Sequence, residues 1–379
     1  MSRRIAYLLL IVLASLTTIA CQNASTTPDG KWQEEAIPTR YASGFTMWQG
    51  EGYRRIEIVN PWDTTRLLRT YILVDANDTL PSRLPEGKVV RTPLRNVLVF
   101  SSVHCSLLRE LNALDAIGGI CDSEYVYVDE LQRRLQAGTL ADAGNSTAPD
   151  IEKIIELNPD AILLSPFENL RHERLENTQI PIIECADYME LSPLGRAEWM
   201  KVIGLLMGCE SVADSLFAQV ERDYLATCQH IAVDSMRPSV ITERRTGSVW
   251  YMPGGKSYMA RLLWDAGANY LWSDNENTGS IPLSFESVLE RGQSADFWLI
   301  KYHAEHDMTY RTLADEFAAN TRFKAFEQGK VYGCNTLYHR YYEETPFHPE
   351  RLLQDLAAIF HPTLYENYTP YYFSTLANE

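Results

Sequence analysis

Two stretches of the chain repeat one order of features. Residues 150–165 (DIEKIIELNPDAILLS) contain a capped helix, an aspartate at Asp160 and then a buried strand. Residues 284–301 (SFESVLERGQSADFWLIK) contain the same order, with the aspartate at Asp296. Continuous apolar strands that alternate with helices are typical of parallel α/β sheets. Two copies of this order therefore predict two similar lobes, each built on a parallel sheet.

A second pair of segments supports the repeat. The helices predicted from Ser106 and from Ser257 each follow a strand and each reach an Asp-Ala pair, at Asp115 and Asp265. Ser257 is also a favourable helix N-cap. Both halves therefore contain a strand, a loop, a helix and an Asp-Ala pair, in that order.

The segment between the two halves predicts a bridge. Residues 192–232 keep a helical spacing of apolar side chains and contain no proline after Pro193. We interpret them as one long helix, with a break near Gly208, that joins the lobes. The fold class is thus α/β, with an N-terminal lobe at 37–191 and a C-terminal lobe at 233–379.

The first residues resemble an export signal. Residues 1–20 contain two arginines and an apolar run that is short for a bilayer span, and they end before Cys21. The sequence TIAC at this point resembles a bacterial lipoprotein signal, with a threonine where an aliphatic residue is usual. We expect lipid on Cys21 and a polar tether at 21–36, with ordinary cleavage and a free Cys21 as the alternative. The mature protein would then be anchored in the cell envelope and face the periplasm.

Charge and cysteine spacing exclude some functions. The net charge is −16 at pH 7, which argues against a nucleic-acid partner because phosphate neutralisation needs clustered Lys and Arg. The other six cysteines form no C-x-x-C pair, which argues against a zinc cage or a thioredoxin-like motif. We expect a monomer with no resident cofactor.

The sequence GGKS at 254–257 suggests a phosphate-binding loop but departs from its pattern. The motif G-x-x-x-x-G-K-[ST] needs a glycine where Trp250 stands, and Pro253 lacks an amide hydrogen. We interpret this segment as a tight turn that leads into a helix.

Five segments in this order resemble the class III periplasmic binding proteins, the iron-siderophore, haem and cobalamin receptors of ABC importers. They are FSSVHCSLLRELNALDAIGGI (100–120), IIELNPDAILLS (154–165), GRAEWMKVIGLL (195–206), PGGKSYMARLLWDAGANYLW (253–272) and LSFESVLERGQSADFWLI (283–300). The resemblance covers most of residues 95–360. It does not cover residues 22–92. We interpret residues 37–92 as short strands added to the first lobe. It implies a ligand cleft between the lobes, with the glycine-rich loop at its rim, and partners that are a membrane permease and its ATPase.

Ligands of open α/β sheets lie beyond the carboxyl ends of the strands, and this rule selects candidate residues. In the first lobe the candidates are Ser102, His104, Tyr125 and Phe167. In the second lobe they are Arg244, Arg245, Trp250, Tyr251, Gly254, Tyr302, His303 and Tyr338. For each of them the alternative is a packing or surface role.

These residue types suit a metal chelate. Aromatic faces cover large flat ligands, and arginines pair with carboxylate or catecholate oxygens. His104, His303 or Tyr338 could ligate haem iron. The pair His303 and His306 leaves a bare manganese or zinc receptor as an alternative, although further ligands are not evident.

The family also implies acidic docking residues and bears on the ligand. One acidic residue on each lobe meets arginines of the permease, and the matching positions here are Glu286 and, in competition with Glu173, Glu168. Stabilisation of a helix N-terminus is the alternative role for Glu286. Corrinoid receptors of the family place an aromatic residue where Ile281 stands, which favours a ferric siderophore or haem over a corrinoid.

We therefore expect a substrate-binding lipoprotein of an ABC importer that is not an enzyme. A cobalamin receptor of the same family is the alternative. An exported hydrolase is disfavoured because G-x-S-x-G and H-E-x-x-H are both absent. A scavenging or sensory lipoprotein that works without an importer remains open.

Overall fold

The computed structural model describes residues 32–170 and 172–379. The helices and strands of the described residues lie in the compact unit Glu35–Glu379. The predicted signal peptide and Cys21 lie outside the described residues. In the part of the chain that is described, no helix has both the length and the apolar character needed to cross a membrane.

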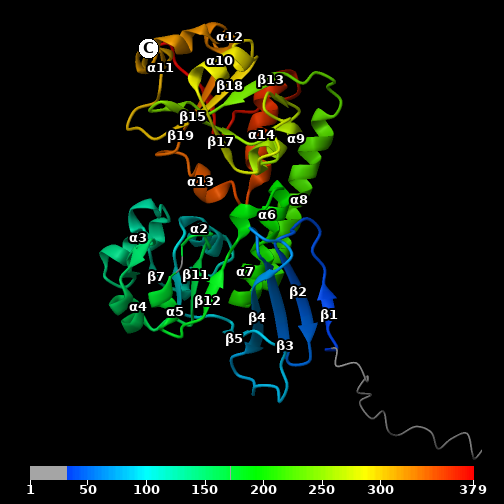
Figure 1. Cartoon of the computed structure of the whole chain (residues 1–379), viewed down its shortest axis with the longest axis vertical. Helices are drawn as coiled ribbons and strands as arrows, with labels where there is room; N and C mark the ends of the chain where they lie inside the picture. Colours follow the sequence, from blue (N-terminus) through cyan, green and yellow to red (C-terminus); the bar gives the residue numbers. More distant parts are fainter. Residues whose placement is uncertain (1–31, 171) are drawn as a thin grey trace, which may run out of the picture. The chain divides into compact units, whose positions relative to one another are not determined.

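The N-terminal lobe contains a parallel five-stranded sheet in the order β12-β11-β6-β7-β8 (Figure 1). Its strands are β6 (Val97–Val99), β7 (Ile117–Ile120), β8 (Ala141–Asp142), β11 (Ala161–Leu164) and β12 (Ile182–Glu184). Its helices are α2 (Ser102–Glu110), α3 (Asp129–Gln136), α4 (Ile151–Leu157) and α5 (Glu173–Glu176). Adjacent residues of β6 belong to different apolar clusters, since Val97 and Val99 lie in one and Leu98 in another. The sheet is thus buried on both faces, as expected for a parallel sheet.

The C-terminal lobe repeats this plan in the order β16-β13-β18-β19-β20, in which only β20 is antiparallel to its neighbour. Its strands are β13 (Ser239–Thr242), β16 (Asn269–Tyr270), β18 (Phe297–Tyr302), β19 (Val331–Asn335) and β20 (Ser374–Thr375). A small antiparallel sheet joins β14 (Arg245–Thr246), β15 (Val249–Pro253) and β17 (Ser280–Leu283). The helices are α9 (Tyr258–Asp265), α10 (Phe285–Gly292), α11 (Tyr310–Glu316), α12 (Lys324–Glu327), α13 (Tyr341–Glu344) and α14 (Pro349–Phe360). Two lobes with parallel sheets confirm the predicted fold class.

The repeated aspartates have the same structural role in both lobes. Asp160, which precedes β11, accepts hydrogen bonds from the backbone N–H groups of Arg95 and Asn96, just before the paired strand β6. Asp296, which precedes β18, accepts bonds from the backbone and hydroxyl of Ser239 at the start of the paired strand β13. Each carboxylate therefore fixes the start of two neighbouring strands, which explains why the sequence order recurs.

The predicted helix caps are confirmed. The side chains of Asp150, Ser257 and Ser284 accept hydrogen bonds from backbone N–H groups in the first turns of α4, α9 and α10. The helix after β6 begins at Ser102, however, and not at the predicted Ser106. The earlier start places His104 inside the helix, and Ser101, in extended geometry, precedes the helix without a side-chain cap hydrogen bond.

Residues 192–232 form three helices and not one long helix: α6 (Pro193–Glu198), α7 (Met200–Met207) and α8 (Glu210–Ile231). The predicted break near Gly208 is confirmed, and a second break lies at Trp199. Gly208 ends α7 in the left-handed region at φ 69°, which is the ordinary way in which a glycine stops a helix. The residues that precede the parallel sheet of the N-terminal lobe form a separate five-stranded sheet. Its strands are β1 (Glu35–Ile37), β2 (Phe45–Gly50), β3 (Tyr53–Val59), β4 (Leu67–Asp75) and β5 (Lys88–Thr92). The strands predicted there are confirmed.

The sheet of β1 to β5 is hydrogen-bonded to the edge of the parallel sheet in the N-terminal lobe. The hydroxyl of Tyr71 on β4 donates to the carbonyl of Ile182 at 3.0 Å and accepts from the N–H of Glu184 at 2.9 Å. Both partners lie on β12, the edge strand of the parallel sheet. The phenol thus joins the two sheets through the exposed hydrogen-bonding edge of β12.

Candidate functional site

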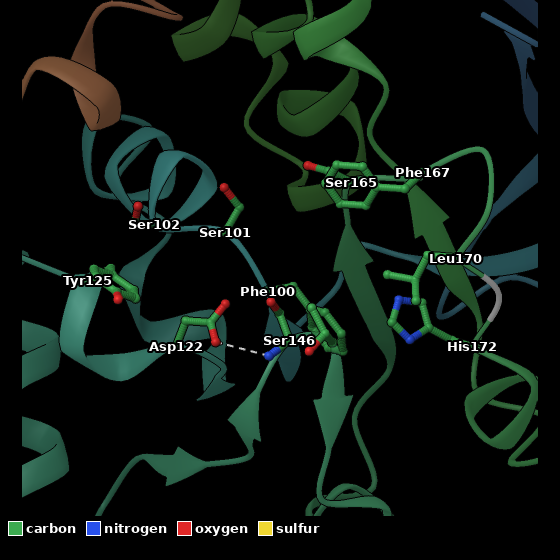
Figure 2. Close-up of a pocket in the computed structure, with 11 residues that line it drawn as sticks. Phe100, Ser101, Ser102, Asp122, Tyr125, Ser146, Ser165, Phe167, Leu170 and His172 are labelled. Atoms are coloured by element: carbon green, nitrogen blue, oxygen red, sulfur yellow. Dashed lines mark hydrogen bonds between the residues drawn. The ribbon is translucent and has the colours of Figure 1, made fainter. Parts of the chain in front are cut away.

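Polar and aromatic side chains meet at the carboxyl ends of three neighbouring strands in the N-terminal lobe. They line a cavity of about 280 Å³, which we call the serine cavity (Figure 2). Its residues follow β6, β7 and β11 and include Ser101, Ser102, Asp122, Tyr125, Ser165 and Phe167. The structure therefore brings together three of the residues predicted from the strand-end rule, Ser102, Tyr125 and Phe167.

Asp122 is the only carboxylate among the described residues that line the serine cavity. Its backbone is left-handed at φ 49°, and its Oδ1 accepts a hydrogen bond from the N–H of Ser146 at 3.0 Å (Figure 2). Ser146 lies in the turn between β9 (Gly144–Asn145) and β10 (Ala148–Pro149). Burial lowers the pKa of His172 on the opposite wall, and Glu176 only partly offsets this effect, so the imidazole is neutral at pH 7. The serine cavity therefore carries no positive charge among its described residues.

A larger cavity of about 740 Å³ lies between residues of both lobes. Val103, the Tyr188–Leu191 segment and Arg196 form one side, and ends of β13, β15 and β18 together with α13 form the other. Five tyrosines line this tyrosine cavity: Tyr188, Tyr251, Tyr258, Tyr341 and Tyr342. Two of them, Tyr251 and Tyr342, are 52% and 58% exposed, so their rings are open to a ligand.

The two cavities adjoin, and we refer to them together as the cleft. Phe167 lines the serine cavity and Tyr188 lines the tyrosine cavity, and their ring centroids are 5.6 Å apart. The neighbouring residues Ser102 and Val103 also line one cavity each. A third cavity of about 490 Å³ is lined by residues 123–132 and 336–340, and α13 packs against α2 (Figure 1).

The charged groups of the tyrosine cavity are already paired within the protein. The ammonium of Lys301 forms an ion pair with Glu243, and Nε of Arg196 lies 3.2 Å from Oδ2 of Asp187. Burial opposes the charge of Lys301, but Glu243 outweighs it and raises the pKa of the lysine above its usual value. Lys301 is therefore charged at neutral pH and neutralised by its partner.

His104 and Tyr302 do not reach the cleft, which corrects two predictions. His104 is 1% exposed, and its Nε2 lies 3.0 Å from Oδ1 of Asp187. Burial alone would raise the pKa of Asp187, but His104 and Arg196 hold it below its usual value. The hydroxyl of Tyr302 accepts from the N–H of Met308 at 3.0 Å, and the ring is buried. Both side chains position neighbouring loops.

Trp250 lies in the core of the C-terminal lobe and not at the cleft rim. Its side chain is fully buried, stacks on Trp298 with ring centroids 5.5 Å apart, and donates from Nε1 to the carbonyl of Thr242 at 2.9 Å. A buried indole with a satisfied N–H is a packing residue. Trp250 faces inward and its neighbour Tyr251 faces outward in the pleat of β15, so only Tyr251 lines the cavity.

The two predicted arginines are engaged outside the cleft. The guanidinium of Arg244 hydrogen-bonds both carboxylate oxygens of Glu316, at 3.1 and 2.9 Å. The guanidinium of Arg245 lies 4.0 Å from the ring centroid of Phe317. Among the described residues that line the serine and tyrosine cavities, neither arginine occurs.

The glycine-rich loop approaches another loop of the protein, where we predicted close approach of a ligand. A Cβ on Gly254 would lie 2.2 Å from the carbonyl oxygen of Asn277, and one on Gly255 would lie 2.3 Å from that of Asn275. Both glycines are thus required by backbone packing. The facing loop, with Thr278 and Gly279, lines the tyrosine cavity.

The histidines and Tyr338 lie on loops at the end of β18 and β19. His303 and His306 are exposed, and Nδ1 of His303 lies 3.2 Å from Oγ1 of Thr336. The hydroxyl of Tyr338 donates to the carbonyl of Glu305 at 2.5 Å, and its ring lines the third cavity. Within residues 32–170 and 172–379, no group of three or more His, Cys, Asp and Glu side chains is placed to hold a metal ion.

Both acidic docking candidates are exposed. Glu286 lies in the first turn of α10, next to the cap Ser284, and Glu168 lies in the loop that follows β11. This placement leaves either side chain free to meet a partner, and docking itself stays a prediction.

Two features of the site were not predicted from the sequence, α13 and the ion pair Glu243–Lys301. Tyr341 and Tyr342 of this short helix line the tyrosine cavity. Their signal in the sequence is the aromatic cluster that follows β19, YHRYY at residues 338–342. The helix is too short to show a period, so it could not be found by spacing alone.

Comparisons with known proteins identify the family. The family model described as periplasmic binding protein matches residues 108–336, which is more than half of the chain. An uncharacterised lipoprotein of Methanocaldococcus jannaschii is 27% identical over 319 residues, which cover 80% of this chain and 75% of the relative. A second uncharacterised lipoprotein of that organism is 23% identical and covers 78% and 76%.

Solved structures share the fold at low identity. A periplasmic haem-binding protein of Pseudomonas aeruginosa superposes with a TM-score of 0.58 and 14% identity, over 75% of this chain and 98% of the other. An Fe³⁺-hydroxamate transport protein of Saccharomonospora viridis superposes with a TM-score of 0.55 and 18% identity, over 71% and 94%.

The chain therefore belongs to the periplasmic binding protein family, and its two-lobed fold is that of the class III members. Members of this family bind small solutes for ABC importers, together with a permease and an ATPase, and are not enzymes.

Proposed function

We propose that this protein is a lipid-anchored receptor that captures an iron complex, a siderophore or haem, in the cleft and delivers it to the permease of an ABC importer. The observation that carries the proposal is the cleft itself, in which the serine and tyrosine cavities adjoin at the strand ends. Two proteins with similar structures, the haem-binding protein and the Fe³⁺-hydroxamate transport protein, support an iron complex as the ligand.

The size and lining of the tyrosine cavity suit such a ligand. Its volume of about 740 Å³ lies in the range of small-molecule sites, roughly 300–1,000 Å³. The exposed rings of Tyr251 and Tyr342 offer flat apolar surface with a polar end. Ser102 and Ser165 of the serine cavity add hydroxyl groups that can orient a polar edge of the complex.

The anchor and the location rest on the first residues and on the relatives. Two relatives bear the name lipoprotein, which supports lipidation of Cys21 and a place in the cell envelope. Metabolic labelling with a fatty acid tests the anchor: a Cys21→Ser variant should lose the label and leave the membrane fraction.

Calorimetric titration tests the ligand. The chain from residue 22 onward keeps the compact unit Glu35–Glu379 and serves as the receptor. The panel holds ferric hydroxamate and catecholate complexes, haem, cobalamin, manganese and zinc, with each metal-free chelator as control. Saturable binding of one iron complex, at one per chain and without binding of its metal-free form, is expected. Binding of cobalamin alone, or of no compound, would overturn the assignment of an iron complex.

Uptake in cells tests delivery. Glu286→Arg and Glu168→Arg should lower uptake of the complex while its affinity for the isolated receptor stays unchanged, because charge pairs at a rim act on docking. Glu327→Arg changes a charge elsewhere on the C-terminal lobe and serves as the control. If neither substitution lowers uptake, Glu286 and Glu168 do not dock to the permease.

A further inference from the structure

The net charge of the described side chains that line the cleft is zero or negative. The described residues that line the tyrosine cavity include two cations, Arg196 and Lys301, and two carboxylates, Glu190 and Glu243. The serine cavity contributes the carboxylate of Asp122. Among the described residues that line the cleft, two cations thus face three carboxylates, so the cleft has no surplus positive charge.

The cations of the tyrosine cavity are held by protein partners. Side-chain exposure is 15% for Lys301 and 25% for Glu243, and it is 19% for Arg196 and 3% for its partner Asp187. An anionic ligand would have to break one of these pairs or enter without a counter-charge. A buried charge that is left unpaired is costly in either case.

Glu243 owes its position to an unusual backbone. It follows β13 with φ 64°, in the left-handed region that non-glycine residues rarely adopt. Two hydrogen bonds hold this geometry: its N–H donates to the carbonyl of Leu299 at 2.8 Å, and its carbonyl accepts from Nε1 of Trp298 at 2.7 Å. The strained residue lies at the carboxyl end of a strand, where its carboxylate meets Lys301.

We infer that the cleft selects an electroneutral ferric complex, such as a ferric trihydroxamate, over anionic catecholate complexes and haem, and that Glu243 sets this selectivity by neutralising Lys301. The inference rests on the proposed function and narrows its ligand class. Three hydroxamates neutralise Fe³⁺, whereas three catecholates leave the complex strongly anionic and the propionates of haem are anionic as well. The arginines that would have served an anion, Arg244 and Arg245, are engaged elsewhere.

The test compares three probes on one receptor: ferrichrome, which is a neutral ferric trihydroxamate, a ferric tris-catecholate, and haem. Titration of the wild-type receptor should give an affinity for ferrichrome at least about 10-fold higher than for either anion, a step of about 1.4 kcal/mol. Tighter binding of the catecholate or of haem would overturn the inference and leave the receptor function standing. No binding of any probe would overturn the proposed function, and the inference with it.

Two substitutions with opposite effects on charge test the role of Glu243. Glu243→Gln frees the positive charge of Lys301 and should raise the affinity for the catecholate at least about 10-fold. Lys301→Gln frees the carboxylate and should lower the same affinity. The readout is the ratio of the affinity for the catecholate to the affinity for ferrichrome, which should rise at least about 10-fold in Glu243→Gln and fall in Lys301→Gln. Glu316→Gln is the control, because its partner Arg244 lies outside the cleft. This substitution should change the affinity for neither ligand.

A purely structural role for Glu243 gives a different pattern. Both substitutions would then weaken all three probes together, with no change in the ratio between neutral and anionic complexes. That result would overturn the assignment of charge selectivity to this pair.

Discussion

His348 joins the two lobes through buried carboxylates, and its titration should control stability. It precedes α14, and its Nε2 contacts the carboxylate of Glu110 on α2, while its Nδ1 lies 2.8 Å from Glu350. Burial lowers the pKa of the imidazole, but the hydrogen bonds to Glu110 and Glu350 outweigh it and raise the pKa from 6.5 to about 9. The folded state thus favours the protonated ring.

The sign of the pH dependence follows from this rise. Because the pKa is higher in the folded state, the contribution to stability is fully present below the unfolded value of 6.5 and is lost as the pH rises through 9. A shift of this size corresponds to about 3 kcal/mol, at 1.36 kcal/mol for each pKa unit. Wild-type protein should therefore lose about 3 kcal/mol from this group between pH 6.5 and 9.5.

Urea unfolding at both pH values measures this loss, and a variant isolates it. His348→Gln cannot titrate, so the free energy of unfolding should fall by about 3 kcal/mol less than in wild type over the same range. His306→Gln, at an exposed position, should follow the wild-type curve within about 0.5 kcal/mol. Equal pH dependence in wild type and in His348→Gln would refute the reasoning.

Three further outcomes follow from packing. Gly254→Ala should destabilise the fold by about 1–3 kcal/mol in urea unfolding, because its Cβ meets backbone carbonyls, whereas Gly279→Ala, with open space around it, should change little. Trp250→Phe should lower the free energy of unfolding by about 2 kcal/mol and leave the affinity for the ligand unchanged. A loss of affinity without a loss of stability would instead show that Trp250 contacts the ligand. Among the described cysteines, a thiol reagent should modify at most Cys209 and Cys228 in the folded protein, since the others are buried, and mass spectrometry of labelled peptides would show any exception.

The features predicted well are those that depend on nearby residues. The caps at Asp150 and Ser257 bind N–H groups only two or three residues further along, so their chemistry is visible in the sequence. The convergence of Ser102 and Tyr125 in one cavity also follows, because parallel strands end at the same edge of a sheet.

The errors concern side-chain direction and tertiary partners. Trp250 and Tyr251 are neighbours in one strand, and only packing against Trp298 decides which of them is buried. The partner of Arg244, Glu316, lies 72 residues away in the sequence, so no local pattern could show that this guanidinium is engaged. The pair Glu243–Lys301 was missed for the same reason.

The central claim is that an iron complex binds in the cleft, and a variant that fills the cleft tests it directly. Gly279 lines the tyrosine cavity, and a Cβ added there meets no other atom within 4 Å, so Gly279→Trp attaches an indole at an open position of the cavity wall. The measurement is the Kd of the best-bound ferric complex for wild type, Gly279→Ala and Gly279→Trp. The account predicts affinity near wild type for the alanine variant and a loss of at least about 100-fold, or about 2.7 kcal/mol, for the tryptophan variant, with both stably folded. Unchanged affinity in Gly279→Trp would contradict the placement of the ligand in the cleft.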